Sequence, residues 1–165
     1  MSVNDTVANY IAAGVPRSKI RVGIPLYGHS WYVPAIGDGW SAFGAAAVQQ
    51  GACCGPLKPT RGAQPGLGAQ QCGTMMYSEI LAAAPQHNAT DAETASTVAY
   101  WSAPGADGGH TAAGTWLSYN DAQSVAATAA WARAQGLAGV FVFDASMDSS
   151  DWALVRAVVA GAAPS

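Results

Sequence analysis

Two acidic residues near the end of the chain are the first candidates for chemistry. Asp144 and Asp148 follow a nearly continuous apolar run, and two carboxyl groups beside one reacting bond can act as acid and base. Their spacing in the sequence does not establish that both groups approach such a bond. We therefore interpret Asp144 and Asp148 as loop or helix-cap residues.

Cysteine chemistry is confined to one short stretch that holds Cys53, Cys54 and Cys72. Three cysteines permit one disulfide, between Cys72 and either member of the vicinal pair, and leave one thiol over. A zinc site needs a fourth ligand at suitable spacing, and the histidines are distant in sequence, so we predict no metal site. A cysteine-based toxin or inhibitor module would rest on these three residues alone.

Charge is scarce, because only 10% of the 165 residues are charged and the formal net charge is −3. Nucleic acid and anionic lipid are therefore not expected as partners, and a neutral substrate fits better. The chain has no apolar run of about 18 residues and begins with polar residues, so neither a membrane span nor an export signal is expected. Glycosylation sequons at Asn4 and Asn88 favour a secreted parent protein.

Hydrophobic periodicity predicts the elements that would position these residues. Helices are predicted over 3–13, 76–84, 121–135 and 150–160, and strands over 20–27, 97–101, 115–119 and 137–144. The strands at 97–101 and 115–119 are predicted to form a hairpin around a Gly-rich turn. Residues 33–75 lack sustained periodicity and are predicted to be a long connection or an irregular insertion.

The first and last predicted strands indicate an α/β fold, because apolar strands between helices are typical of parallel, buried sheets. Pro25 has no backbone N–H, so regular pairing of the first strand is predicted to end there. Two parallel strands alone leave two sheet edges unsatisfied. We therefore expect further strands to come from outside these residues.

Four segments together resemble family 18 glycoside hydrolases, which are chitinase-like (β/α)8 barrels, and they occur in the family's order. They are Val15-Pro16-Arg17-Ser18-Lys19-Ile20 leading into Gly23-Ile24-Pro25-Leu26-Tyr27-Gly28-His29-Ser30-Trp31, then Met76-Tyr77-Ser78-Glu79-Ile80, then Trp116-Leu117-Ser118-Tyr119-Asn120-Asp121 with Ser124, and finally Gly136-Leu137-Ala138-Gly139-Val140-Phe141-Val142-Phe143-Asp144. Each segment alone would be a weak signal, whereas the joint match is specific.

The resemblance implies the C-terminal part of a (β/α)8 TIM barrel, with residues 20–27 and 138–144 as its seventh and eighth strands. Residues 1–31 and 116–165 would form the partial barrel segment. Residues 32–115 would form the small α+β insertion domain that many chitinases have between these two strands.

Barrel enzymes build their sites at the carboxyl ends of strands. This placement predicts that the following residues lie where a substrate would bind: Tyr27, His29, Phe143 and Asp144. The resemblance implies that Tyr27 and His29 line a sugar cleft and that Glu79 helps to shape its wall. Tryptophan rings could stack on sugar, Trp31 foremost among Trp31, Trp40, Trp101 and Trp116. The alternatives are core packing for the aromatic residues and ordinary solvated positions for His29 and Glu79.

Two departures from the family pattern limit the expected activity. Phe143 stands where the family has a tryptophan beneath the cleaved sugar, so weaker or altered stacking is expected. The family's Asp-x-x-Asp-x-Asp-x-Glu strand, whose Glu protonates the leaving oxygen, has no counterpart, and Asp91-Ala92-Glu93 is its nearest echo. Family 18 hydrolysis is substrate-assisted and uses no cofactor, so without that acid no catalytic residue is assigned.

The resemblance thus implies a portion of a chitinase-like glycoside hydrolase that binds β-1,4 N-acetylglucosamine polymers, which the complete, extracellular parent would hydrolyse. Its expected partners are chitin or N-acetylglucosamine oligosaccharides, together with the missing N-terminal barrel segment or another chain. The alternative is a non-catalytic carbohydrate-binding or structural protein that completes its sheet by assembly with another chain.

Overall fold

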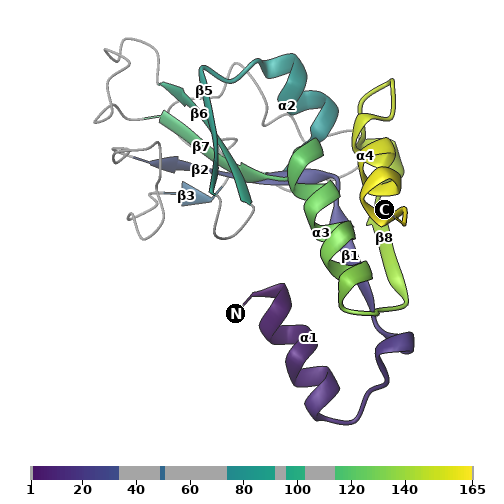
Figure 1. The fold of residues 1–165 in the computed structure, drawn as a ribbon. Helices are drawn as coiled ribbons and strands as arrows, with labels where there is room; N and C mark the ends of the chain where they lie inside the picture. Colours follow the sequence, from purple (N-terminus) through teal and green to yellow (C-terminus); the bar gives the residue numbers. More distant parts are fainter. Residues whose placement is uncertain (1, 34–48, 51–73, 92–95, 103–113, 165) are drawn as a thin grey trace.

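The computed structural model describes residues 2–33, 49–50, 74–91, 96–102 and 114–164 (Figure 1). Its elements, in chain order, are α1 (Val3–Ala12), η1 (Arg17–Lys19), β1 (Arg21–Pro25), β2 (Tyr27–Val33), β3 (Gln49–Gln50), β4 (Thr74–Met76), α2 (Tyr77–Ala83), β5 (His87–Asp91), β6 (Ser96–Ser102), β7 (Gly114–Tyr119), α3 (Ala122–Ala134), β8 (Gly139–Phe143), η4 (Ala145–Met147) and α4 (Ala153–Ala162).

β1 and β8 form a two-stranded parallel sheet, as the sequence predicts. The register pairs Arg21 with Gly139 and Pro25 with Phe143. α3 and α4 lie beside this pair (Figure 1), and the side chains of Ile24, Val125 and Leu154 meet between strands and helices. This arrangement of parallel strands backed by helices is the layer expected of an α/β fold.

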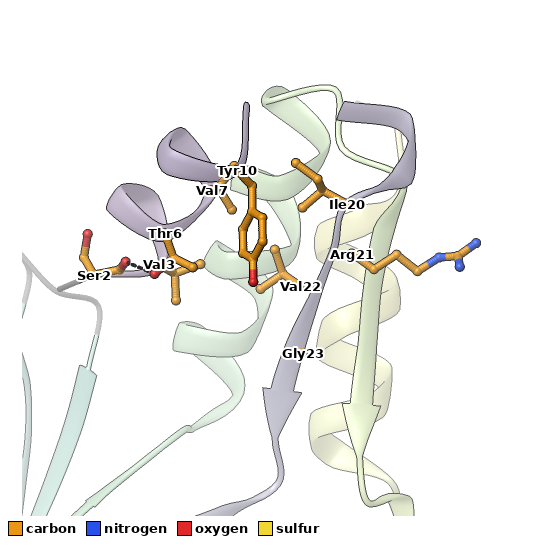
Figure 2. A pocket seen from close by; sticks show the side chains of 9 residues that line it. All are labelled: Ser2, Val3, Thr6, Val7, Tyr10, Ile20, Arg21, Val22 and Gly23. Atoms are coloured by element: carbon orange, nitrogen blue, oxygen red, sulfur yellow. Dashed lines mark hydrogen bonds between the residues drawn. The ribbon is translucent and has the colours of Figure 1, made fainter. Parts of the chain in front are cut away.

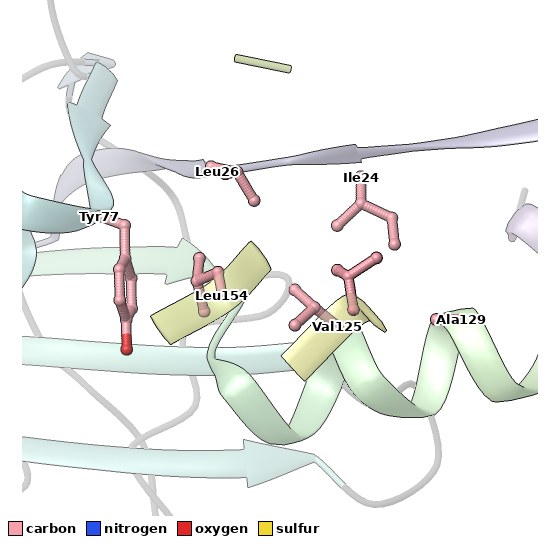
Figure 3. Close-up of a cluster of buried hydrophobic side chains, with 7 residues drawn as sticks. Ile24, Leu26, Tyr77, Val125, Ala129 and Leu154 are labelled. Atoms are coloured by element: carbon pink, nitrogen blue, oxygen red, sulfur yellow. The ribbon is translucent and has the colours of Figure 1, made fainter. Parts of the chain in front are cut away.

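Alternation along each strand decides which residues enter this core. Figure 3 shows its largest cluster, which consists of Ile24, Leu26, Tyr77, Val125, Ala129, Leu154 and Val158. α1 joins a second cluster, in which Val7 packs with Ile20, Val22 and Ala132. The helices therefore depend on the strands for burial, since an isolated short helix is marginally stable in water.

The other face of the parallel pair carries aromatic residues. Phe141 and Phe143 are 51% and 37% exposed, whereas Val140 and Val142, which alternate with them, pack against the core. Both rings lie over Gly23, where an added Cβ would come within 2.9 Å of Phe141 and 3.0 Å of Phe143. Two partly exposed aromatic rings therefore cover this part of β1 and β8.

The second sheet has six strands, in the order β3-β2-β7-β6-β5, with β4 also paired to β2. It confirms the predicted antiparallel pairing of 97–101 with 115–119. α2 packs on one face, where the buried residues are Met75, Ile80, Ala83, Ala99 and Leu117. A separate cluster is formed by Val33, Val98, Tyr100 and Trp116.

The strand predicted over 20–27 is in fact two strands in different sheets, and this corrects the prediction. Pairing of β1 ends at Pro25 as expected, but Gly28 lies within β2 instead of ending a strand. The change of direction occurs at Leu26, whose N–H donates to the carbonyl of Phe143 while its own carbonyl accepts from Tyr77. Local sequence does not reveal these partners, because they come from distant segments.

Three further strands were not predicted, and the domain boundaries stay a prediction. β3, β4 and β5 are short, at two, three and five residues, and they lack the apolar alternation that indicates a strand. The predicted boundaries at 31/32 and 115/116 fall inside β2 and β7, which pair with each other from His29–Ser118 to Val33–Gly114. Among the described residues, no helix is long and apolar enough to cross a membrane.

Candidate functional site

A row of four aromatic rings runs from the end of β8 along β2. The centroid of Tyr27 lies 5.7 Å from that of Phe143 and 5.4 Å from that of His29, with both pairs close to perpendicular. The row continues from His29 to Trp31 at 6.2 Å. Tyr27, His29 and Trp31 are half-buried and Phe143 is 37% exposed, so each ring keeps some surface open to solvent.

Strand geometry explains why these rings meet. Tyr27, His29 and Trp31 occupy alternate positions of β2, and alternate residues of a strand lie on the same face. Phe143 is paired with Pro25, two residues before Tyr27, so the chain delivers Tyr27 beside the end of β8. The row therefore joins the two sheets and begins at the carboxyl end of the parallel strands.

Polar atoms accompany the rings. Nδ1 of His29 lies 3.5 Å from the hydroxyl oxygen of Thr74 in β4, which pairs with β2 at this position. An imidazole can both donate and accept hydrogen bonds, as can the hydroxyl group of Tyr27. Half-exposed rings interleaved with such groups are suited to a neutral ligand that has both apolar faces and hydroxyl groups.

Glu79 has a structural role that the sequence did not reveal. Its Oε2 accepts a hydrogen bond of 2.8 Å from the backbone N–H of Met76, which caps the first turn of α2. Met76 pairs with Tyr27 across β4 and β2, so this turn begins next to the aromatic row. The expectation that Glu79 shapes a cleft wall stays a prediction.

The carboxylates at the end of β8 are caps, which confirms their interpretation from the sequence. Asp144 accepts from the N–H of Ser146 at 2.9 Å and also from the hydroxyl group of Ser146, at the start of η4. Asp148 is buried and accepts from the N–H groups of Leu154 at 3.1 Å and Val155 at 2.9 Å. Both side chains thus stabilise the turn that leads into α4.

The tryptophan candidates separate into different environments. Trp31 belongs to the row, and Trp116 is buried beside it at a centroid distance of 5.5 Å. Trp101 packs with the cluster under α2, where its Nε1 donates to the carbonyl of Ala83 at 3.2 Å. Thr74 was not among the predicted site residues, because it follows a stretch without periodicity.

Several residues considered in the sequence lie outside the described residues: Cys53, Cys54, Cys72, Trp40, Ala92 and Glu93. Within the described part of the chain, no group of three or more histidine, cysteine, aspartate or glutamate side chains could hold a metal ion.

Comparison with known proteins places this chain in a family. The profile of the glycosyl hydrolases family 18 matches residues 1–148. The chain belongs to glycosyl hydrolase family 18. A class V chitinase of Lotus japonicus, CHIT5, is 29% identical over 150 residues, and the chitinase-like protein Idgf3 of Drosophila melanogaster is 28% identical over 162 residues.

Solved family 18 structures share the fold. A class V chitinase from Nicotiana tobaccum in complex with NAG4 superposes with a TM-score of 0.70 at 23% identity, over 98% of this chain and 39% of that one. Human YKL-39, described as a pseudo-chitinase with retained chitooligosaccharide binding, gives 0.70 at 23% identity over 96% and 39% of the two chains. The predicted fold, the C-terminal part of a (β/α)8 barrel with an inserted α+β part, is confirmed.

The chain spans about a third of the length of these curated relatives. The match to CHIT5 includes 91% of this chain and 31% of CHIT5, and the match to Idgf3 includes 89% of this chain and 33% of Idgf3.

A groove of about 320 Å³ lies between α1 and β1. Figure 2 shows the side chains that line it. It is lined by Ser2, Val3, Thr6, Val7, Tyr10, Ile20, Arg21, Val22 and Gly23. This groove runs along the first half of β1, whereas the aromatic row starts beyond its carboxyl end.

Two tyrosines near the row make the stability of the folded chain depend on pH in the alkaline range. Burial, and secondly the carboxylate of Asp121, raise the pKa of both Tyr77 and Tyr119 above the ordinary value. The folded chain therefore keeps phenolic protons that the unfolded chain releases near pH 10. The contribution of these two tyrosines to the free energy of unfolding should be fully present below about pH 10, and the free energy of unfolding should fall as the pH rises further. Urea titrations at increasing pH test this, and Tyr119→Phe should make the fall shallower; an unchanged slope would contradict it.

Proposed function

We propose that this chain is the part of a chitinase-like family 18 protein that contributes one wall of a sugar-binding cleft. The observation that carries the proposal is the row Phe143, Tyr27, His29 and Trp31, in which every ring keeps exposed surface. The proposed ligand is a β-1,4 N-acetylglucosamine oligosaccharide or chitin. Solved relatives from Nicotiana tobaccum and Cycas revoluta are described as complexes with NAG4 and (GlcNAc)3, which supports this class of ligand.

The physical match is between pyranose rings and aromatic faces. The C–H faces of a sugar are apolar and its hydroxyl groups seek donors and acceptors, so rings with interleaved Tyr and His groups can bind both. The ligand carries no charge, which agrees with a chain in which only 10% of residues are charged. Phe143 gives the row a smaller ring than a tryptophan and no N–H, so its stacking at this position should be weak.

The proposal assigns binding, and not hydrolysis, to these residues. Asp144 and Asp148 act as caps, and the sequence has no Asp-x-x-Asp-x-Asp-x-Glu strand. A complete parent that carries this strand would cleave the polymer by substrate assistance, because the N-acetyl carbonyl group can attack once an acid protonates the glycosidic oxygen.

Removing Trp31 should weaken sugar binding without a general loss of structure. Trp31→Ala is expected to raise the Kd for chitotetraose about tenfold, since the ring supplies one stacking face of the row. Isothermal titration calorimetry measures this, and the 165-residue chain should release no product from the same sugar. Trp101→Ala is the matched control, because it removes the same side chain from the cluster under α2.

The outcomes of this experiment separate binding from catalysis. Equal affinity in wild type and Trp31→Ala, with far-UV circular dichroism intact, would contradict the proposed site. Hydrolysis of chitotetraose by a preparation of the chain that is free of contaminating chitinase would overturn the proposal that this chain binds sugar without cleaving it.

A second candidate function is a non-catalytic protein that assembles with another chain. The groove of about 320 Å³ beside β1, with Val3, Val7 and Tyr10 in its lining, favours it, as does the exposed Phe141. An upstream barrel segment of a longer parent would cover the same surfaces. Multi-angle light scattering tests whether the chain assembles with another chain. A monomeric mass with a cooperative melt argues against assembly.

We propose an extracellular location for the parent. Its support is the two glycosylation sequons, whose asparagines, Asn4 in α1 and Asn88 in β5, are both exposed. β5 pairs with β6 at one end of the described sheet order, so a glycan at Asn88 would lie next to a sheet edge and protect it from pairing with other chains.

A further inference from the structure

The change from one sheet to the other takes place over a single residue. β1 ends at Pro25, β2 begins at Tyr27, and Leu26 between them is fully buried. The aromatic row crosses the same point, because Phe143 belongs to β8 and Tyr27 to β2. The position of the Tyr27 ring against Phe143 therefore depends on how the backbone turns at Leu26.

One peptide group is held at both of its ends. The N–H of Leu26 donates to the carbonyl oxygen of Phe143 at 3.0 Å. The carbonyl oxygen of Pro25, which belongs to the same peptide plane, accepts from Nδ2 of Asn120 at 3.0 Å. Since a peptide group is planar, fixing its N–H and its C=O fixes the rotation of the whole unit.

Asn120 is itself held in a defined orientation. It directly follows β7 and is half-buried, its Nδ2 donates to the carbonyl oxygen of Pro25, and its Oδ1 lies 3.5 Å from the hydroxyl oxygen of Ser124. The backbones are in close approach here, because a Cβ on Gly28 would come within 2.7 Å of Cβ of Tyr119. Asn120 thus links the end of β7 to the end of β1.

We infer that Asn120 is a positioning residue for sugar binding: by holding the Pro25–Leu26 peptide group it places Tyr27 against Phe143 and keeps the aromatic row continuous. The inference rests on the proposed function of the row. Asn120 lies outside the row and acts through the backbone of β1 and β2.

The decisive variant is Asn120→Asp, which keeps the shape of the side chain but removes its N–H donors. A carboxylate oxygen would then face the carbonyl oxygen of Pro25, and two acceptors cannot bond. We expect the Kd for chitotetraose to rise about five- to tenfold, and the nuclear Overhauser contacts between the rings of Tyr27 and Phe143 to weaken.

Asp121→Ala is the matched control, because it removes a neighbouring side chain that caps α3 through the N–H of Ser124 and gives no bond to Pro25. It should lower stability yet leave sugar affinity and the Tyr27–Phe143 contacts unchanged. Unchanged ring contacts in Asn120→Asp, or equal losses in both variants, would overturn the inference. If wild-type chain fails to bind chitotetraose, the proposed function falls, while the ring contacts still decide whether Asn120 positions Tyr27.

Discussion

Asp148→Ala is expected to lower the free energy of unfolding by about 3 kcal/mol, because it removes the acceptor for several buried or half-buried N–H groups. Oδ1 accepts from Ser149 at 2.7 Å and Leu154 at 3.1 Å, and Oδ2 accepts from Val155 at 2.9 Å. The first N–H groups of a helix have no partner within the helix, so α4 depends on this side chain. Urea denaturation with a constant m-value measures the change.

Asp151→Ala is the control for this experiment, since Asp151 is an exposed acidic residue near the same helix end that accepts only from the side chains of Arg156 and Ser149 among the bonds observed, and from no N–H group of α4. Exposed ion pairs contribute little, so its urea midpoint should stay close to that of wild type. A small effect of Asp148→Ala, comparable to that of Asp151→Ala, would show that the buried cap is not needed. Either result bears on function, because it decides whether the buried carboxylate of Asp148 is committed to structure.

Gly161→Ala is expected to destabilise the chain by about 2 kcal/mol, although alanine ordinarily favours a helix over glycine by roughly 1 kcal/mol. A Cβ at Gly161 would lie 2.2 Å from the carbonyl oxygen of Ala126, a backbone atom that cannot rotate away. α3 and α4 would have to separate, and the contacts of Val125 and Ala129 with Leu154 and Val158 would loosen.

Val159→Ala is the matched control on the same helix. Val159 is 64% exposed, so this change raises helix propensity without adding an atom to the interface, and it should be neutral or slightly stabilising. A thermal melt followed by circular dichroism compares the two variants. A stabilised Gly161→Ala chain would mean that α3 and α4 can move apart at little cost.

The parallel pair and its helices were predictable because their signals are local. An apolar run from Leu137 to Phe143 indicates a buried strand, and apolar residues such as Leu154 and Val158 recur at helical spacing in α4. The helix predicted from residue 150 nevertheless begins at Ala153, since Asp148 and Ser149 form its cap. These capping side chains lie four to seven residues before the N–H groups that they accept from, and no simple sequence spacing predicts such a cap.

The candidate site was predictable only in part. Tyr27, His29 and Phe143 could be placed near each other, because residues at the ends of neighbouring parallel strands meet at one edge. The contact of His29 with Thr74 required the pairing of β4 with β2, which joins segments 45 or more residues apart. The capping of Met76 by Glu79 is instead a local contact between residues three apart in the chain. The ring of Trp101 turned away because its position in β6 faces α2.

By itself, the sequence determined the α/β class, the parallel strands around Ile24 and Val142, the end of β1 at Pro25 and the absence of a family acid motif. These features follow from residue type and from the local periodicity of apolar residues, so each of them can be predicted from a single segment of the chain. The tertiary structure alone decided that β2 leaves the barrel sheet at Leu26 and that Asn120 holds the peptide group there. Its reason is physical: the donors and acceptors that turn the chain at Leu26 belong to β8, α2 and the end of β7, and only folding brings them to one place.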